Sequence, residues 1–180
     1  EFDAVAASVI FSRTFGDDLT LSAGPGILAA RQVTDFGEDD YILLTLPLSG
    51  ELDRRDDELN AQRGYYINAE ITPFFGLDEA PSGGRAYADL RAYVSFGEND
   101  RFTLAARGQI GSLFGADPDE APADFLFYSG GGGTVRGQPY DSLGYERVVT
   151  INGTDLDVVT GGASFLGAQL EARVGVTQRI

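Results

Sequence analysis

Apolar and polar side chains alternate with a period of two along several long stretches of this chain. The clearest stretch is residues 85–96, where even positions carry Ala, Leu, Val and Phe and odd positions carry Arg, Tyr, Asp and Ser. Successive side chains of a β-strand point to opposite faces, so this pattern predicts a strand with one apolar and one polar, charged face. The alternation predicts seven such strands, at residues 2–12, 19–29, 42–48, 65–71, 85–96, 102–114 and 166–176.

The predicted strands are long, and their connections differ in length. Several run to about 11–14 residues, whereas strands of globular proteins are commonly about 5–6 residues long. Residues 13–18 and 97–100 are short turns, residues 33–40 and 77–84 are polar loops, and the link from Gly115 to about Gly162 is very long. Long amphipathic strands with connections mostly short on one side and long on the other are typical of an all-β, antiparallel transmembrane β-barrel.

A soluble β-sandwich is the alternative fold, because its strands also alternate. Sandwich cores usually take bulky Val, Ile and Phe, whereas the apolar faces here are rich in Ala, Leu and Gly. The polar faces hold Arg85, Asp89, Arg91, Arg107, Glu171 and Arg173. This mixture of charges suits a water-filled lumen and favours the barrel. Phenylalanines near the predicted strand ends would suit interfacial aromatic girdles, and they are Phe74, Phe75, Phe96, Phe102 and Phe114.

Seven strands form an incomplete barrel. An odd number of antiparallel strands places the two ends of the segment on opposite membrane faces, and an open edge in lipid exposes unpaired backbone groups. We therefore expect residues 1–180 to be part of a larger barrel domain whose closing strands lie outside this sequence.

The composition argues against several functional classes. With 13 basic and 28 acidic residues the net charge is −15, which argues against nucleic acid as a partner because phosphate binding needs a basic surface. The chain has no Cys and no His, so disulfides, Cys- or His-ligated metal sites and His-dependent catalytic triads are excluded. No apolar run approaches the roughly 20 residues of a membrane helix. We expect no enzymatic activity and no cofactor.

Other candidate motifs are weaker. The glycine run at 130–133 lacks the Lys-Ser/Thr of a phosphate-binding loop. Acidic residues at 117–120 and 155–157 lack the spacing of a calcium-binding loop. The acidic groups at 39–40 and 56–58 are better explained as solvated loop charges than as paired catalytic carboxylates.

The segment from Phe127 to Gly144 joins a glycine run to Val-Arg-Gly, an aromatic residue and Ser-Leu-Gly. Its marked positions are Phe127, Gly130, Gly131, Gly132, Gly133, Val135, Arg136, Gly137, Tyr140, Ser142, Leu143 and Gly144. Residues 53–64 and 161–171 carry two further patterns at matching distances. Together these segments resemble the BamA/TamA superfamily of outer-membrane protein-assembly barrels, also called bacterial surface antigens, and the likeness is closest to the TamA branch. Gln138 departs from the pattern, which has Phe or Tyr at that position.

The resemblance implies a barrel of about 16 strands in the bacterial outer membrane, one that assists the insertion or translocation of other β-barrel or autotransporter proteins. The implied partners are outer-membrane lipid, unfolded substrate proteins and a periplasmic partner bound through POTRA domains, which lie outside this sequence. Residues 53–63 would form a periplasmic turn. Two alternatives stay open, namely a two-partner-secretion exporter of one cargo protein and a passive porin.

The resemblance also implies that the loop at about 115–162 folds into the barrel lumen, with Val135, Arg136, Gly137 and Tyr140 near its tip. Glycine allows tight turns because it accepts positive φ without penalty. Alternation places Glu171 on the polar face, and a guanidinium offers a carboxylate a rigid fork of donors. We therefore predict an Arg136–Glu171 ion pair, called the clasp below, contributing about 1–2 kcal/mol in a wet lumen. The alternative is an exposed Arg136 without this role.

Overall fold

The computed structural model describes residues 2–34, 37–78, 80–118, 120–151 and 154–175. The strands are β1 (Phe2–Ser8), β2 (Phe11–Phe15), β3 (Leu19–Ala23), β4 (Gly26–Thr34), β5 (Gly37–Thr45), β6 (Leu48–Asp53), β7 (Gly64–Gly76), β8 (Gly83–Phe96), β9 (Phe102–Phe114), β10 (Tyr145–Ile151), β11 (Thr154–Thr160) and β12 (Ser164–Val174). Two short 3-10 helices are η1 (Glu98–Asp100) and η2 (Ala123–Phe125). No helix in these ranges is long and apolar enough to cross a membrane.

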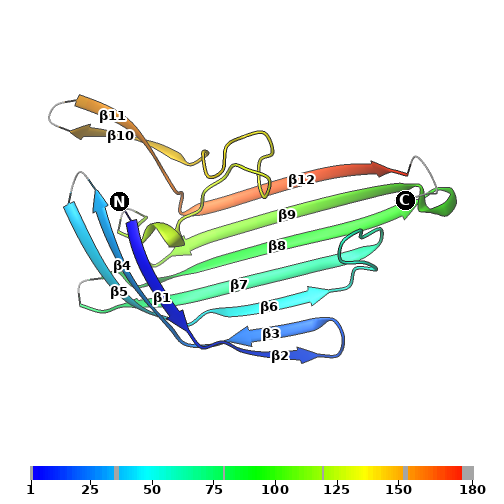
Figure 1. Ribbon diagram of the computed structural model, residues 1–180, viewed down its shortest axis with the longest axis horizontal. Helices are drawn as coiled ribbons and strands as arrows, with labels where there is room; N and C mark the ends of the chain where they lie inside the picture. Colours follow the sequence, from blue (N-terminus) through cyan, green and yellow to red (C-terminus); the bar gives the residue numbers. More distant parts are fainter. Residues whose placement is uncertain (1, 35–36, 79, 119, 152–153, 176–180) are drawn as a thin grey trace.

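Ten strands form one antiparallel sheet, and β10 and β11 form a separate hairpin (Figure 1). The chain crosses the sheet seven times, because β1–β2, β3–β4 and β5–β6 are three divided crossings and β7, β8, β9 and β12 are four single ones. Each crossing pairs with the next one along the chain, so the predicted antiparallel sheet of seven crossings is confirmed. The prediction of a polar loop at 33–40 was wrong, because residues 33–34 belong to β4 and residues 37–40 to β5. Within the described residues β12 pairs only with β9, which leaves the sheet open.

The three divided crossings break at the same level of the sheet. In the register of the sheet, residues 9–10 lie opposite 24–25, residues 24–25 lie opposite 46–47, and residues 46–47 lie opposite 72–73 of β7. Two of the breaks contain Pro25 and Pro47, and Pro73 lies opposite them in the unbroken strand β7. We call these three residues the proline line, and proline cannot donate to a ladder. Their carbonyls still accept bonds from neighbouring crossings, at 3.0, 3.2 and 3.0 Å respectively. Beyond this line β1, β4 and β5 turn away from β2, β3 and β6 (Figure 1).

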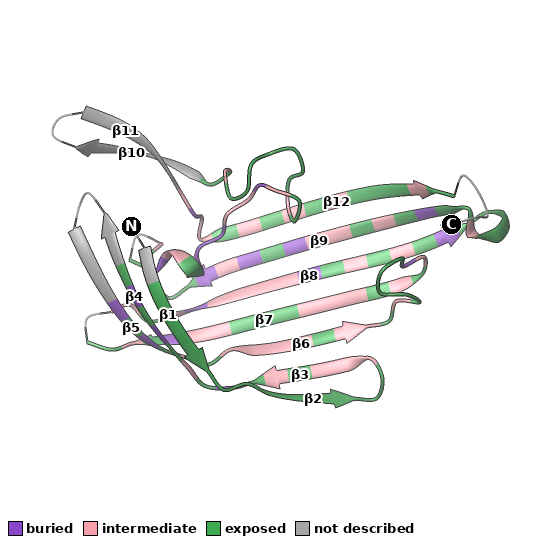
Figure 2. Cartoon of the chain, viewed as in Figure 1, coloured by how far each residue is buried: buried purple, intermediate pink, exposed green. Residues whose placement is uncertain are grey.

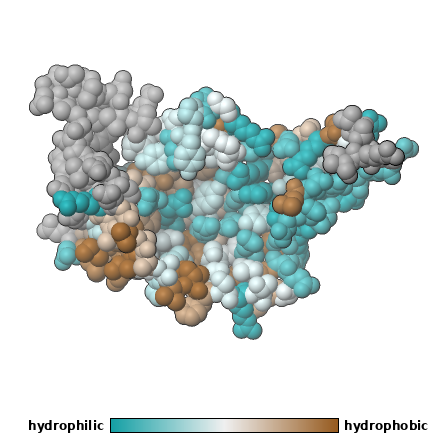
Figure 3. Space-filling view, viewed as in Figure 1, coloured by the Kyte–Doolittle hydropathy of each residue, from teal (hydrophilic) through white to brown (hydrophobic). Residues whose placement is uncertain are grey.

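Burial is inverted relative to a water-soluble sheet. In β9 the apolar Leu104 and Ile110 are 49% and 55% exposed, whereas Thr103 and Gln109 are 6% and 4% exposed. Exposed and more buried residues alternate along much of β9 and β12 (Figure 2), and hydrophilic residues cover much of the visible face of the molecule (Figure 3). A soluble sandwich would bury the apolar face, so this arrangement is that of a membrane barrel wall.

Four of the five phenylalanines predicted to face outward do so. Phe75, Phe96, Phe102 and Phe114 are between 40% and 59% exposed. The prediction was wrong for Phe74, which is fully buried and packs against Phe125 with ring centroids 4.5 Å apart. Phe74 lies on the opposite face from Phe75, and the chain after β9 covers it there.

The hydrophobic core lies between the sheet and the loop that joins β9 to β12. It contains Leu28, Ala30, Tyr41, Leu43, Phe74 and Leu113 from the sheet, and Ala121, Phe125 and Leu126 from the loop. The loop is therefore packed against one face of the sheet, close to the ends of β7, β8 and β9.

Candidate functional site

The odd-numbered side chains of β8, β9 and β12 form a polar surface beneath the loop. They include Arg85, Tyr87, Asp89, Arg91, Arg107, Gln109, Gln169, Glu171 and Arg173, which line two pockets or bond to residues that do. The prediction that the charged residues of these strands share one face is confirmed. The described residues contain no cluster of His, Cys, Asp or Glu suited to a metal ion.

Asp89 is the centre of this surface. Its side chain is buried and accepts four hydrogen bonds, at 2.9 and 2.7 Å from Arg107 and at 3.3 and 2.7 Å from Arg91. Two forked guanidiniums compensate the burial of one carboxylate. Sequence reasoning missed this cluster. The signal lay in the register, because Asp89 pairs with Gln109 and diagonal cross-strand neighbours are within reach of long side chains.

Arg107 also contacts the loop. Its Nη1 donates to the carbonyl oxygen of Gly133 at 2.7 Å. Gln169 on β12 donates from Nε2 to the carbonyl oxygens of Gly133 and Thr134, at 3.3 and 2.9 Å. The loop is thus bonded to two neighbouring strands through its main chain.

The four glycines of the run have different structural roles. Gly130 and Gly131 have φ of +121° and +82°, and a Cβ at Gly130 would lie 2.2 Å from the Pro139 carbonyl oxygen. Thr134 Oγ1 accepts from the Gly130 amide at 2.8 Å and donates to its carbonyl at 3.0 Å, which closes the turn. A Cβ at Gly132 or Gly133 would meet nothing within 4 Å. Only the first two glycines are therefore required by the fold of the turn.

The motif that follows the glycines is largely exposed. Val135 and Tyr140 are 41% and 83% exposed, Arg136 is exposed, and Gly137 has a φ of +90°. The departure at Gln138 is accommodated through the main chain, since its amide donates to Val135 and its carbonyl accepts from Gly131.

Arg136 and Glu171 line the same pocket, which has a volume of about 180 Å³. No hydrogen bond or ion pair joins them among the described residues. Glu171 instead accepts from Arg173 Nε at 2.6 Å. The structure thus brings the two predicted partners together, and the clasp stays a prediction.

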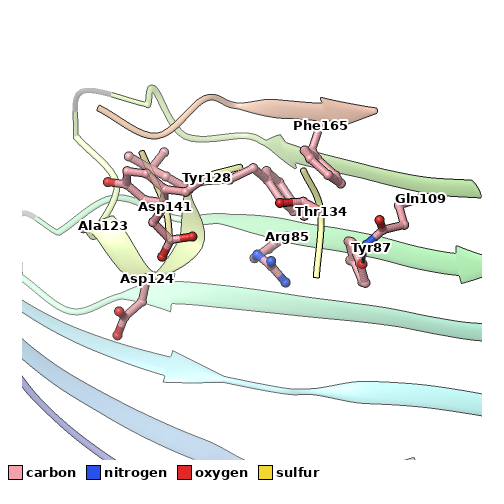
Figure 4. A pocket seen from close by; sticks show the side chains of 11 residues that line it. Arg85, Tyr87, Gln109, Ala123, Asp124, Tyr128, Thr134, Asp141 and Phe165 are labelled. Carbon is pink, nitrogen blue, oxygen red and sulfur yellow. Dashed lines mark hydrogen bonds between the residues drawn. The ribbon is translucent and has the colours of Figure 1, made fainter. Parts of the chain in front are cut away.

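Phe127 anchors the loop shortly before its glycine run. It is 7% exposed, the Arg85 guanidinium lies 4.3 Å from its ring centroid, and Phe165 and Tyr87 stack at 6.2 and 6.4 Å. Figure 4 shows Arg85, Tyr87 and Phe165 around this pocket, whose volume is about 400 Å³. A Cβ at Gly111 would lie 2.4 Å from the Phe127 ring, so the glycine makes room for it.

A second ordered segment is the turn at 54–63, at the opposite end of β7. Asp56 Oδ1 accepts from the amides of Gln62 and Arg63 at 2.9 and 3.0 Å. These amides, that of Arg63 foremost, hold the pKa of the Asp56 carboxyl below its usual value. Arg63 pairs with Asp100 at 2.6 Å, and Ser95 Oγ donates to the Gln62 carbonyl at 2.8 Å. The turn is therefore fixed to its neighbours despite its length.

Comparison with known proteins identifies a family. Residues 11–179 match the model of the Omp85 superfamily domain, whereas a comparison with curated proteins finds no match. Among 53 matching chains of solved structures is BamA from Haemophilus ducreyi lacking POTRA domains 1–3, similar with a TM-score of 0.84 at 13% sequence identity. The likeness covers 99% of this chain and 38% of that one, so the chain spans well under half of the BamA chain.

Proposed function

This chain belongs to the Omp85 superfamily, and from that premise we propose that it forms part of the wall of an outer-membrane barrel that inserts or translocates other proteins. The observation that carries the proposal is the match of residues 11–179 to that family. The inverted burial, with Leu104 and Ile110 exposed on one face and Gln109 enclosed on the other, supports the barrel wall. Such a wall places its apolar face in lipid and its polar face toward a lumen.

The proposed substrates are unfolded β-barrel or autotransporter proteins. We further propose that residues 1–180 are a partial barrel domain and that the loop at about 115–162 lies in the lumen. The bonds from Arg107 and Gln169 to the loop support this position, because both side chains belong to the polar face. The role is one of assembly or transport, and the proposed site binds and positions chain segments without catalysing a reaction.

The test uses the full-length protein reconstituted in lipid vesicles. An unfolded outer-membrane β-barrel protein is added, and its folded fraction is followed by the heat-dependent change in gel mobility. We expect folding to be faster than in empty vesicles and in vesicles that contain an unrelated porin of equal mass. The unrelated porin controls for disturbance of the bilayer.

Three outcomes separate the candidate functions. Faster folding of several unrelated barrel substrates supports the proposal. Passage of a single cargo protein, without faster folding of others, identifies a two-partner-secretion exporter. A steady open-channel conductance without either effect identifies a passive porin and contradicts the proposal.

A further inference from the structure

The loop between β9 and β12 is bonded to the polar face at its glycine run. The acceptors are two main-chain carbonyls, those of Gly133 and Thr134, and the donors are side chains of the sheet. Hydrogen bonds from a charged donor such as a guanidinium are stronger than neutral ones. The loop thus has a defined attachment at this point that uses none of its own side chains.

The two donors form a cross-strand pair. Gln169 of β12 lies directly opposite Arg107 of β9 in the register of the sheet. Directly opposed side chains on one face lie close together, and here both reach the Gly133 carbonyl, at 2.7 Å from Arg107 and 3.3 Å from Gln169. Gln169 extends the contact by one residue, to Thr134 at 2.9 Å. The pairing of β9 with β12 therefore builds the attachment.

Asp89 orients the arginine of this pair. Its carboxylate accepts from Nε and Nη2 of Arg107, which leaves Nη1 directed at the loop. Arg91 also donates to both oxygens of Asp89, but the described residues show no bond from Arg91 to the loop. Asp89 is thus a positioning residue for Arg107, and Arg91 offers a matched comparison.

Arg136 makes no comparable contact. It is exposed and has no hydrogen bond or ion pair among the described residues. Gly132 and Gly133 have open space where a Cβ would stand, so packing does not fix the loop at this point either. The bonds from Arg107 and Gln169 are the specific contacts that remain at the glycine run.

We propose that Arg107 and Gln169 form a loop dock, which fixes the loop through the carbonyls of Gly133 and Thr134. The proposal deepens the proposed function and rests on it for the loop's position in a lumen. It assigns positioning of the loop at the glycine run to two side chains of the barrel wall.

The experiment measures the position of the loop in the full-length protein. The 180 residues contain no cysteine, so Gly132→Cys and Ile110→Cys can carry two spin labels once any cysteine elsewhere is replaced. A side chain at Gly132 has open space, and Ile110 points outward with 55% exposure. Pulsed electron resonance then gives the distribution of distances between the labels.

The expected results differ between variants. The labelled protein and Arg91→Ala should show one narrow distance. Arg107→Ala and Gln169→Glu should broaden the distribution of distances. In each variant the fraction of molecules whose loop has left the wall should rise about tenfold, because the hydrogen bonds of that side chain to the loop are lost. Gln169→Lys keeps a hydrogen-bond donor at position 169, and we expect this variant to keep the narrow distance. If Gln169 acted only by packing, Gln169→Lys would not be expected to differ from Gln169→Glu in this way.

An unchanged distance in both Arg107→Ala and Gln169→Glu would overturn the dock. If Arg107→Ala prevents the barrel from folding, as judged by heat-dependent gel mobility, Gln169→Glu decides, because within the described part of the chain Gln169 makes no hydrogen bond to Asp89. The distances are read without any substrate, so failure of the dock and failure of the proposed function are separate results.

Discussion

At the scale of single residues, two arginines from different parts of the chain approach the carboxylate of Glu171. Arg173, two residues along the same strand, is bonded to it at 2.6 Å, and Arg136 of the loop lines the same pocket. The Glu171 side chain is 43% exposed, so solvent screens both interactions. The clasp can therefore add only modestly to stability while Arg173 holds the carboxylate.

A double-mutant cycle tests the clasp. We expect Arg136→Ala and Glu171→Ala to show a coupling of about 0.2–1 kcal/mol in the full-length protein. Thermal unfolding, followed by gel mobility, measures it. Repeating the cycle in an Arg173→Ala background is the control, and the coupling should rise there because the competing donor is gone. Simple additivity in both backgrounds would exclude the clasp.

Residue pattern predicted part of this site and could not predict the rest. Alternation placed Asp89, Arg107 and Glu171 on one face, as the structure confirms. Alternation could not predict the hydrogen bonds to the carbonyls of Gly133 and Thr134. Every residue has a carbonyl group, and the direction of that group depends on how the loop folds. The sequence likewise could not show that Glu171 bonds to Arg173 and not to Arg136, because this depends on where the loop places the Arg136 side chain.

At the scale of elements, the turn at 54–63 should respond to acid. The pKa of Asp56 lies below its usual value in the folded turn, so ionised Asp56 stabilises the turn above the unfolded pKa, and this contribution is lost as pH falls through the folded pKa. We expect the amides of Gln62 and Arg63 to lose protection from hydrogen exchange below about pH 4.

Hydrogen exchange of the full-length protein, corrected for the intrinsic pH dependence of exchange, measures this effect. Asp56→Ala should remove the protection of both amides at neutral pH. The matched control is Asp57→Ala, because Asp57 accepts instead from the amides of Leu59 and Asn60. Protection that stays constant from pH 7 to about pH 2 would contradict the role given to Asp56.

Prediction of elements succeeded where alternation was unbroken. All seven crossings were predicted, but the divisions within three of them were not, although proline inside a strand pattern signals two of the three, at Pro25 and Pro47. The β10–β11 hairpin was also missed and taken as loop. Asn-Gly, a common hairpin turn sequence, stands at 152–153, and polar and apolar residues alternate from Asp155 to Val158, so the sequence did carry a signal for this hairpin.

At the scale of the whole molecule, the distribution of leucines distinguishes a membrane wall from a soluble sheet. Leu90 is 44% exposed near the middle of β8, and Leu59 is 98% exposed on the turn at 54–63. In the outer membrane, Leu90→Arg should cost about 2–4 kcal/mol because it places a charge in lipid. Leu59→Arg should stay within about 0.5 kcal/mol. Unfolding of the full-length protein from lipid vesicles by guanidinium measures both, and equal costs would contradict a lipid-facing β8.

The proline line also has a mechanical consequence. Where Pro25, Pro47 and Pro73 cross the sheet, single hydrogen bonds replace continuous ladders between the first four crossings. Bending stiffness is lowest along such a line, because curvature there deforms the fewest bonds. A wall loaded from the side will store most of its elastic energy in this band and keep β8, β9 and β12, with the loop attached to them, nearly undeformed.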